Sequence, residues 1–266
     1  MGYPDQATLA AAGLRLTEAG AVLTITLARS ETRNAQTPAT WRAMAAIGAA
    51  CPTDVRVVVI GADGPDFSAG LDRAAFTPGG LPDELSLVEL AGLSDDDLDR
   101  MLAGFQAGFS WLRRPELISV AAVPGAAVGA GFQLALACDL RIVADNVRFA
   151  MREVSHGLVP DLGGSKALAD LVGYSRALEL CATGRWVEAA EARELGIATV
   201  VVPTVRLDDA TTDLVAALTG PLHGSVAAAK QLLLGAGDRT YDEQLQAERT
   251  AQAVRLRDFA DAFGQP

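Results

Sequence analysis

The chain has 266 residues, of which 50% are hydrophobic and 21% are charged, a composition typical of folded globular proteins that excludes an intrinsically disordered chain. Its length predicts one large domain or two small ones. Acidic residues outnumber basic ones by 33 to 22, for a net charge of −11, and because such a surface repels phosphate backbones, we expect no nucleic-acid binding.

The first part of the chain alternates strand and helix patterns. Leucine and isoleucine alternate with polar residues over 14–27, on both sides of a turn with glycine, which predicts a β-hairpin. Thr37 followed by Pro38 predicts the N-cap and first turn of a helix that runs to about Ala50. The apolar run over 55–60 predicts a strand that is covered on both faces.

A loop and a long helix are expected next. Residues 73–93 have weak periodicity and carry two prolines and two consecutive glycines, so they predict an irregular loop. Ser94 is followed by three aspartates and then by apolar residues at helical spacing up to Arg113-Arg114-Pro115. This pattern indicates a helix start with acids in its first turn, and we prefer that interpretation to a metal site.

The stretch 117–140 is almost entirely apolar and is long enough to span a bilayer. Pro124-Gly125 divides it, however, and Gly129 and Gly131 follow soon after. A strand, a turn and a helix that begins with glycine explain this pattern better than a membrane span. We therefore expect no association with a membrane.

Two more strand patterns follow, and the chain is mainly helical from residue 168 onward. Strand patterns cover 140–144, 147–150 and 199–202, and helical patterns cover 175–182, 187–195, 207–219, 224–234 and 241–263. This order of elements indicates an α/β fold with a helical C-terminal part.

The sequence predicts neither a metal site nor a reactive cysteine. The three cysteines, Cys51, Cys138 and Cys181, are far apart and form no CxxC pair, and the only histidines are His156 and His223. We expect buried, reduced cysteines and no zinc site. The first ten residues lack the basic and apolar regions of a signal peptide, so a cytoplasmic location is expected.

Two strand–turn–helix junctions share one design. The strand over 55–60 leads to Ser68-Ala69-Gly70-Leu71, and the strand over 117–123 leads to Gly129-Ala130-Gly131. At each junction, small residues allow a ligand to approach the backbone, and a helix N-terminus offers free N–H groups. Two such donors that face one point form an oxyanion hole. Glycine turns also serve tight packing, and the junctions alone leave both interpretations open.

Three segments identify a resemblance. PDFSAGLD, AAVPGAAVGAGFQLALACDLRIVA and FAMREVSHGLVPDLGG, in this order, resemble the signatures of the enoyl-CoA hydratase/isomerase (crotonase) superfamily. The resemblance extends over essentially the whole chain. It implies a spiral of ββα units with a helical C-terminal region that builds homotrimers, often paired into hexamers. We accordingly expect a core with the acyl-CoA site over 1–195 and a trimerisation region over 196–266.

The resemblance also implies the catalytic groups. The two N–H donors fall at Leu71 and Ala130, where they would stabilise the enolate of an acyl-CoA thioester. Hydratases of this family use two glutamates, and the matching positions here are Gln133 and Glu153. Because an amide cannot accept the proton of water, this departure favours isomerisation of a double bond over hydration, with Glu153 as the base. Alternatively, Gln133 holds a water or hydrogen-bonds in the core.

Asp161 has two interpretations. The resemblance implies a second acid, since dienoyl-CoA isomerases carry an aspartate at this position and halobenzoyl-CoA dehalogenases carry their nucleophile there. An aspartate in Pro160-Asp161-Leu162-Gly163-Gly164 also commonly caps the next helix. His156, which lies between the two acids, is expected to be a partly buried structural residue.

The residues around the motifs imply how the thioester is held. Arg29 and Arg33 precede Asn34-Ala35-Gln36, which resembles the family's segment along the adenosine and pantetheine, and arginine there would meet phosphate. The loop over 73–93 would cover the acyl group. The expected substrate-binding residues are Arg33, Ala35, Ser68, Ala69, Asp72, Gly129 and Gln133.

The sequence thus predicts a cytoplasmic enoyl-CoA isomerase or hydratase of fatty-acid metabolism. It would need no metal and no cofactor, because coenzyme A is part of the substrate. Two alternatives remain: a hydratase that uses Glu153 and Asp161, and a non-catalytic acyl-CoA carrier that lost its chemistry with the change to Gln133.

Overall fold

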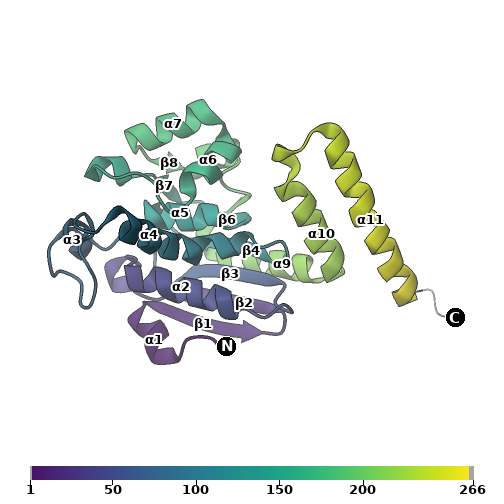
Figure 1. The fold of residues 1–266 in the computed structure, drawn as a ribbon, viewed down its shortest axis with the longest axis horizontal. Helices are drawn as coiled ribbons and strands as arrows, with labels where there is room; N and C mark the ends of the chain where they lie inside the picture. Colours follow the sequence, from purple (N-terminus) through teal and green to yellow (C-terminus); the bar gives the residue numbers. More distant parts are fainter. Residues whose placement is uncertain (1, 264–266) are drawn as a thin grey trace.

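The computed structural model, which describes residues 2–263, has the α/β architecture expected from the sequence (Figure 1). A large sheet has the strand order β1-β2-β3-β4-β6-β9, and a small sheet has the order β5-β7-β8. Within the large sheet β1 and β2 are antiparallel, and every later pair is parallel. The strands are β1 (Leu14–Ala19), β2 (Val22–Leu27), β3 (Val57–Ala62), β4 (Ile118–Val123), β5 (Ala126–Val128), β6 (Leu140–Ala144), β7 (Arg148–Ala150), β8 (Val187–Glu188) and β9 (Val200–Val202).

Helices α1 to α9 surround these sheets, and α10 and α11 stand apart from them (Figure 1). The helices are α1 (Gln6–Ala11), α2 (Pro38–Ala50), α3 (Leu87–Leu90), α4 (Asp95–Ser110), α5 (Ala130–Ala137), α6 (Gly164–Val172), α7 (Tyr174–Thr183), α8 (Ala189–Glu194), α9 (Leu207–Thr219), α10 (His223–Leu234) and α11 (Tyr241–Phe263). Two short 3₁₀ helices, η2 (Arg73–Phe76) and η4 (Glu153–His156), lie next to the site described below.

The central strands β3 and β4 of the large sheet are buried on both faces, whereas the edge strand β1 is largely exposed. Alternate residues of a strand point to opposite faces, and in β3 Val58 and Ile60 join the core that includes α2 and α4. Val57 and Val59 join a second cluster, which includes Leu207 of α9. This two-sided packing explains why parallel strands such as β3 and β4 read as continuous apolar runs.

Local signals placed several elements correctly. Thr37 and Ser94 cap α2 and α4, because their side chains accept hydrogen bonds from the third residue of each helix. The hairpin of β1 and β2 is confirmed as well. The elements α1 and β5 were not predicted from the sequence, because they are too short to show a period. The segment 73–93, predicted as an irregular loop, contains η2 and the short helix α3, which the side chain of Ser86 caps. The segment 187–195, predicted as a helix throughout, begins with the two-residue strand β8, which pairs with β7.

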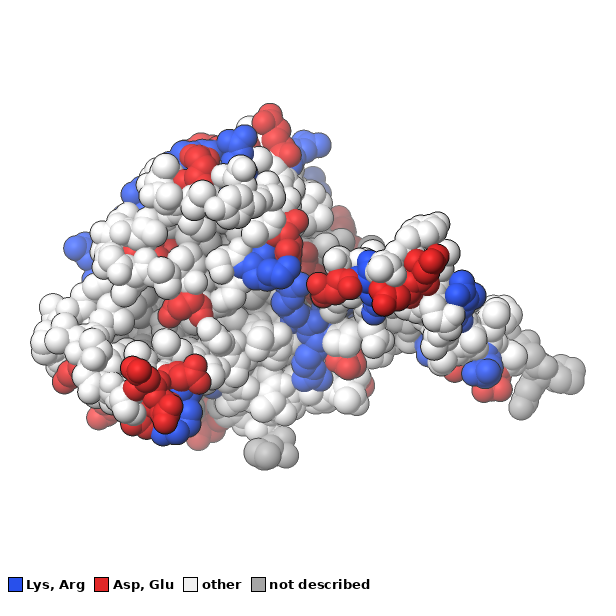
Figure 2. All heavy atoms as spheres, turned by 45° about the horizontal axis from the view of Figure 1, so that its top comes forward, with Lys and Arg blue, Asp and Glu red and all other residues white. Residues whose placement is uncertain are grey.

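The C-terminal part divides into two portions. β9 pairs with β6, and α9 contacts β3, β4 and β6, so both are part of the body. In contrast, α10 and α11 form a helical pair that extends away from it (Figures 1 and 2). The division at residue 195 stays a prediction.

The apolar stretch 117–140 contains β4, β5 and α5. Among residues 2–263, no helix is long and apolar enough to cross a membrane. The same part of the chain contains no group of three or more histidine, cysteine or acidic side chains arranged to hold a metal ion.

Candidate active site

The two glycine-containing junctions lie side by side. Ser68 forms a parallel bridge with Ala127, in which the Ser68 N–H donates to the Ala126 carbonyl at 3.0 Å and the Val128 N–H donates to the Ser68 carbonyl at 2.9 Å. The bridge continues the order of the sheet beyond the ends of β3 and β4. It thereby brings together two segments that are some sixty residues apart in the sequence.

Their close approach depends on glycine. Gly70 has a φ of +86°, and a Cβ on it would lie 2.6 Å from the Val128 carbonyl oxygen and 3.5 Å from the Ala130 nitrogen. A Cβ on Gly131 would lie 2.7 Å from the Cβ of Ser68. Both positions therefore exclude a side chain, and Gly70 adds a backbone conformation that other residues rarely adopt.

Two N–H groups at this junction remain available. The N–H groups of Gly70, Asp72 and Gly129 donate to protein acceptors at 3.2, 2.8 and 2.9 Å. Those of Leu71 and Ala130 donate to no acceptor within residues 2–263. Ala130 is the first residue of α5, where a helix leaves its N–H groups unpaired. Both expected donors thus lack an acceptor in the described part of the chain, which is what an oxyanion hole requires.

A half-buried carboxylate lies beside these donors. Glu153 belongs to η4, and a Cβ on Gly129 would lie only 3.4 Å from its Oε1 atom. Oε1 accepts a hydrogen bond from Gln133 Nε2 at 2.6 Å, whereas Oε2 is buried and has no hydrogen-bond partner among the described residues. Burial raises the pKa of Glu153 above its usual value, and the charge of Asp161 raises it further. These properties suit a general base.

The amide of Gln133 is fixed from both ends. Its Oε1 atom accepts from the N–H groups of Leu162 at 2.9 Å and Gly164 at 3.2 Å, so its NH₂ group faces Glu153. Only 1% of Gln133 is exposed. The side chain therefore holds Glu153 in place through protein contacts. It also lines the cavity, and its predicted contact with substrate stays a prediction.

The structure separates the two interpretations of Asp161. Helix α6 begins at Gly164, its N-cap residue is Gly163, and no side chain caps it. The cap interpretation is therefore wrong, because a glycine in the left-handed region starts this helix without one. Asp161 instead lines the same cavity as Glu153, and burial raises the pKa of its carboxyl. Gln106 of α4 donates to the Asp161 carbonyl at 2.7 Å and fixes this loop.

These groups share a cavity of about 660 Å³, a size typical of small-molecule sites. The predicted site residues along its wall are Ala69, Leu71, Gly129, Ala130, Gln133, Glu153 and Asp161. His156 also lines it and packs against Phe76 at 5.0 Å between ring centroids. His156 is exposed rather than partly buried as expected, because η4 lies at the surface.

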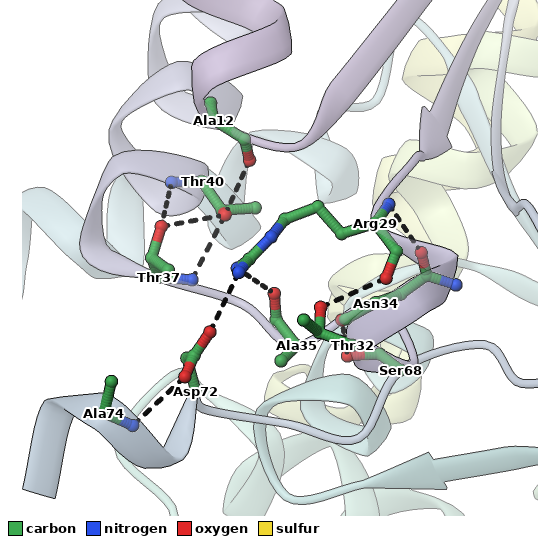
Figure 3. A network of polar contacts seen from close by, with 10 residues as sticks. All are labelled: Ala12, Arg29, Thr32, Asn34, Ala35, Thr37, Thr40, Ser68, Asp72 and Ala74. Carbon is green, nitrogen blue, oxygen red and sulfur yellow. Dashed lines mark hydrogen bonds and ion pairs between the residues drawn. The ribbon is translucent and has the colours of Figure 1, made fainter. Parts of the chain in front are cut away.

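Other predicted substrate-binding residues support the backbone instead (Figure 3). Arg29 donates to the Ala35 carbonyl at 3.0 Å and pairs with the Asp72 carboxylate at 3.0 Å, so its charge is used within the protein. Ser68 is fully buried, and its hydroxyl donates to the Asn34 carbonyl at 2.8 Å. In the described part of the chain, the lining of the cavity does not include Ala35, Ser68 or Asp72.

Arg33 lines a smaller pocket that adjoins the main cavity. This pocket has a volume of about 230 Å³, and Ala69 and Val128 line both spaces. Arg33 is 76% exposed at its side chain and lies 3.8 Å from Asp66. Arg148 and Trp186 also line the pocket, with the guanidinium 4.8 Å from the centre of the indole ring.

The sequence alone did not predict Arg148 and Trp186 as residues of the site. The two residues come from β7 and from the segment before β8, and pairing of these strands brings them together. Neither residue belongs to a motif. An isolated arginine followed by a tryptophan almost forty positions later carries no local signal.

The raised pKa of Glu153 leads to a prediction about pH. A base works as the carboxylate, so kcat/KM should fall as the pH drops through the raised pKa. Asp161→Asn removes a like charge, lowers the pKa of Glu153 and should move this acid limb to lower pH. The pH profile of kcat/KM measures the shift. Asp213→Asn, on the exposed surface of α9, removes the same charge and should leave the limb in place. An unmoved limb in Asp161→Asn would contradict the coupling.

The chain is similar to known proteins in both sequence and structure. The family model described as enoyl-CoA hydratase/isomerase matches residues 17–260. The structure is similar to that of a candidate enoyl-CoA hydratase from Thermobifida fusca YX, with a TM-score of 0.93 and 46% sequence identity. The match to its complex with CoA covers 97% of this chain and 98% of the Thermobifida chain. Its complex with acetoacetyl-CoA covers 96% and 99%.

Curated relatives have two different activities. The peroxisomal Delta(3,5)-Delta(2,4)-dienoyl-CoA isomerase of Arabidopsis thaliana is 28% identical over 204 residues, which are 76% of this chain and 73% of the relative. The carnitinyl-CoA dehydratase of Salmonella agona (strain SL483) is 34% identical over 235 residues, or 86% of this chain and 83% of the relative.

Proposed function

Because this chain belongs to the enoyl-CoA hydratase/isomerase family, we propose that it is an enzyme that moves a double bond along the acyl chain of an enoyl-CoA thioester. One observation carries the choice of isomerisation. The site has a single carboxylate with a free, buried oxygen beside the two N–H donors, and an amide occupies the place of the second glutamate that hydratases use. An isomerase needs one base, and Gln133 is unable to be a second one.

The N–H groups of Leu71 and Ala130 bind the thioester oxygen. When a proton leaves the α-carbon, the electrons of its bond delocalise onto that oxygen, and the two donors stabilise the resulting charge. Each such donor contributes about 3 to 4 kcal/mol to the transition state. Since the donors belong to a fixed backbone, they do not reorganise during the reaction.

Glu153 moves the proton. Its Oε2 atom accepts the proton from the α-carbon of a 3-enoyl thioester and returns it to the γ-carbon, which forms the conjugated 2-enoyl product and restores the carboxylate. No electron is gained or lost, so the step needs no redox cofactor. Asp161 is the second acid when the substrate is a dienoyl thioester.

The smaller pocket supports binding of coenzyme A. Arg33 offers an exposed guanidinium, and Arg148 with Trp186 forms the adjoining wall. Guanidinium groups bind phosphate by charge-assisted hydrogen bonds. The CoA part then enters past Ala69 and Val128, while the acyl part lies in the main cavity.

Two assays test this function. With 3-enoyl-CoA, the absorbance of the conjugated thioester should rise, and with 2-enoyl-CoA it should stay constant. Loss of that absorbance would support the second candidate, a hydratase in which Asp161 joins Glu153, an option favoured by the presence of both acids in one cavity. A non-catalytic carrier would show no exchange of α-hydrogen for solvent deuterium.

A homotrimer, or a hexamer of two trimers, is part of the proposal. The pair of α10 and α11 extends from the body and carries exposed apolar side chains, among them Leu233, Leu234 and Leu256. Such surfaces are typical of subunit interfaces. Light scattering measures the molar mass, and a monomer at all concentrations would contradict this assembly.

We also propose a cytoplasmic location. All three cysteines are free, two of them are buried, and reduced thiols are typical of that compartment. Cell fractionation tests it, and recovery of the protein in a secreted fraction would contradict it.

A further inference from the structure

The main cavity has a polar side and an apolar side. Its polar lining residues all come from position 73, position 133 and the segment 152–161. Every lining residue from α2, from α3 with its C-cap residue Ala91, and from α4 is apolar. These residues are Pro38, Trp41, Leu87, Leu90, Ala91, Leu98, Leu102 and Phe105. The indole N–H of Trp41 donates to Gln36 at 2.8 Å, so only the carbon surface of this ring is open to a ligand. An acyl chain that extends from the catalytic groups into this side of the cavity therefore contacts only apolar side chains.

Phe105 stands at the boundary of this apolar side. A second cavity of about 520 Å³ lies next to the first, and four residues line both: Pro38, Leu85, Leu90 and Phe105. The second cavity is charged, since Arg42, Glu84, Asp97 and Arg100 line it. Phe105 is 4% exposed. The four shared side chains thus separate an apolar space from a charged one.

Phe105 is held in place by its neighbours. Its ring meets that of Trp41 edge-on at 5.0 Å between centroids, a favourable geometry for an aromatic pair. The opposite part of the boundary is fixed by an ion pair between Arg42 of α2 and Glu84, which precedes Leu85 in the chain. The boundary is therefore fixed by contacts between α2, α4 and the segment before α3.

We propose that this site takes thioesters with an unsubstituted hydrocarbon chain that continues several carbons beyond the double bond, and that Phe105 sets the greatest length that fits. This inference rests on the proposed function. Each methylene that enters the apolar side should strengthen binding about fourfold. A chain that reaches Phe105 would have to displace it toward the charged cavity, so the gain should end there.

A series of straight 3-enoyl-CoA thioesters tests the proposal: butenoyl, hexenoyl, octenoyl, decenoyl and dodecenoyl. For the wild type, kcat/KM should rise at least tenfold from butenoyl to its optimum and then fall. In Phe105→Ala the optimum should move to a longer chain, while the shorter thioesters are still converted. An optimum at butenoyl in the wild type, or an unchanged optimum in the variant, would overturn the proposal and leave the isomerase function standing.

Phe109→Ala is the matched control. Phe109 lies one turn later on α4, is 2% exposed, and also meets the Trp41 ring edge-on, but it does not line the cavity. It should lower thermal stability as Phe105→Ala does and leave the preferred length unchanged. If the alanine variant fails to fold, Phe105→Leu opens less space and should shift the optimum in the same direction.

Binding separates this proposal from the proposed function. Calorimetry with saturated butyryl-CoA, octanoyl-CoA and decanoyl-CoA measures affinity without turnover. If affinity rises with length and no thioester is converted, the apolar site stands and the isomerase function fails. If conversion occurs and affinity does not depend on length, the function stands and the length proposal fails.

Discussion

Glu153→Gln is expected to lower kcat by about a thousandfold or more, because general base catalysis commonly contributes a factor of about 10² to 10⁴. Among the described residues, no other carboxylate has a buried oxygen without a hydrogen-bond partner. The glutamine has the same shape as the acid. In the wild type the Gln133 NH₂ group donates to Glu153 Oε1 at 2.6 Å. The side-chain oxygen of the new glutamine can accept the same hydrogen bond. The loss should therefore arise from the missing charge and not from a collapsed site.

Two measurements complete this experiment. The dissociation constant of a saturated acyl-CoA should change by less than about tenfold, since the donors at Leu71 and Ala130 and the apolar wall are untouched. Glu194→Gln, on the exposed surface of α8, should keep wild-type turnover. Full activity in Glu153→Gln would exclude this residue as the base.

Gly70→Ala is expected to lower kcat by about 10² to 10³, the factor typical of losing one oxyanion donor. The added Cβ would lie 2.6 Å from the Val128 carbonyl oxygen, in a backbone with a φ of +86°. The segment must move to relieve this contact, and the neighbouring Leu71 N–H moves with it. Binding of substrate should weaken less than turnover, since the donors act most strongly on the charged transition state.

The control for this variant separates backbone strain from donor geometry. Gly20 lies in the turn between β1 and β2, has a φ of +58°, and has no neighbouring atom within 4 Å of an added Cβ. Gly20→Ala should thus cost about 1 to 2 kcal/mol of stability and leave kcat unchanged. If the two variants lose stability and activity in parallel, or if Gly70→Ala turns over normally, the donor at Leu71 does not act as proposed.

The sequence predicts features that depend on local chemistry. Thr37 and Ser94 mark helix starts because their side chains cap the residues next to them. The glycines at positions 70 and 129 mark turns because their backbone φ is positive. The resemblance adds the order of the motifs, and the α/β fold of the family is confirmed.

Features that depend on distant contacts were out of reach. Asp161 looks like a helix cap in sequence because nothing local distinguishes an acid that caps from one that lines a cavity. The orientation of Gln133 follows from N–H groups 29 and 31 residues away. The apolar wall needs α2 and α4 packed together, which no periodicity within either helix reveals.

The fixed amide of Gln133 has a stereochemical consequence. Its two acceptor contacts direct the NH₂ group at Glu153 Oε1, so the proton in transit is confined to Oε2. One oxygen in one position reaches only one side of a planar dienolate. The hydrogen should then leave and return suprafacially, and a reaction run in heavy water should place deuterium at a single prochiral position, which NMR can read. Deuterium spread over both positions would show that a second proton carrier takes part.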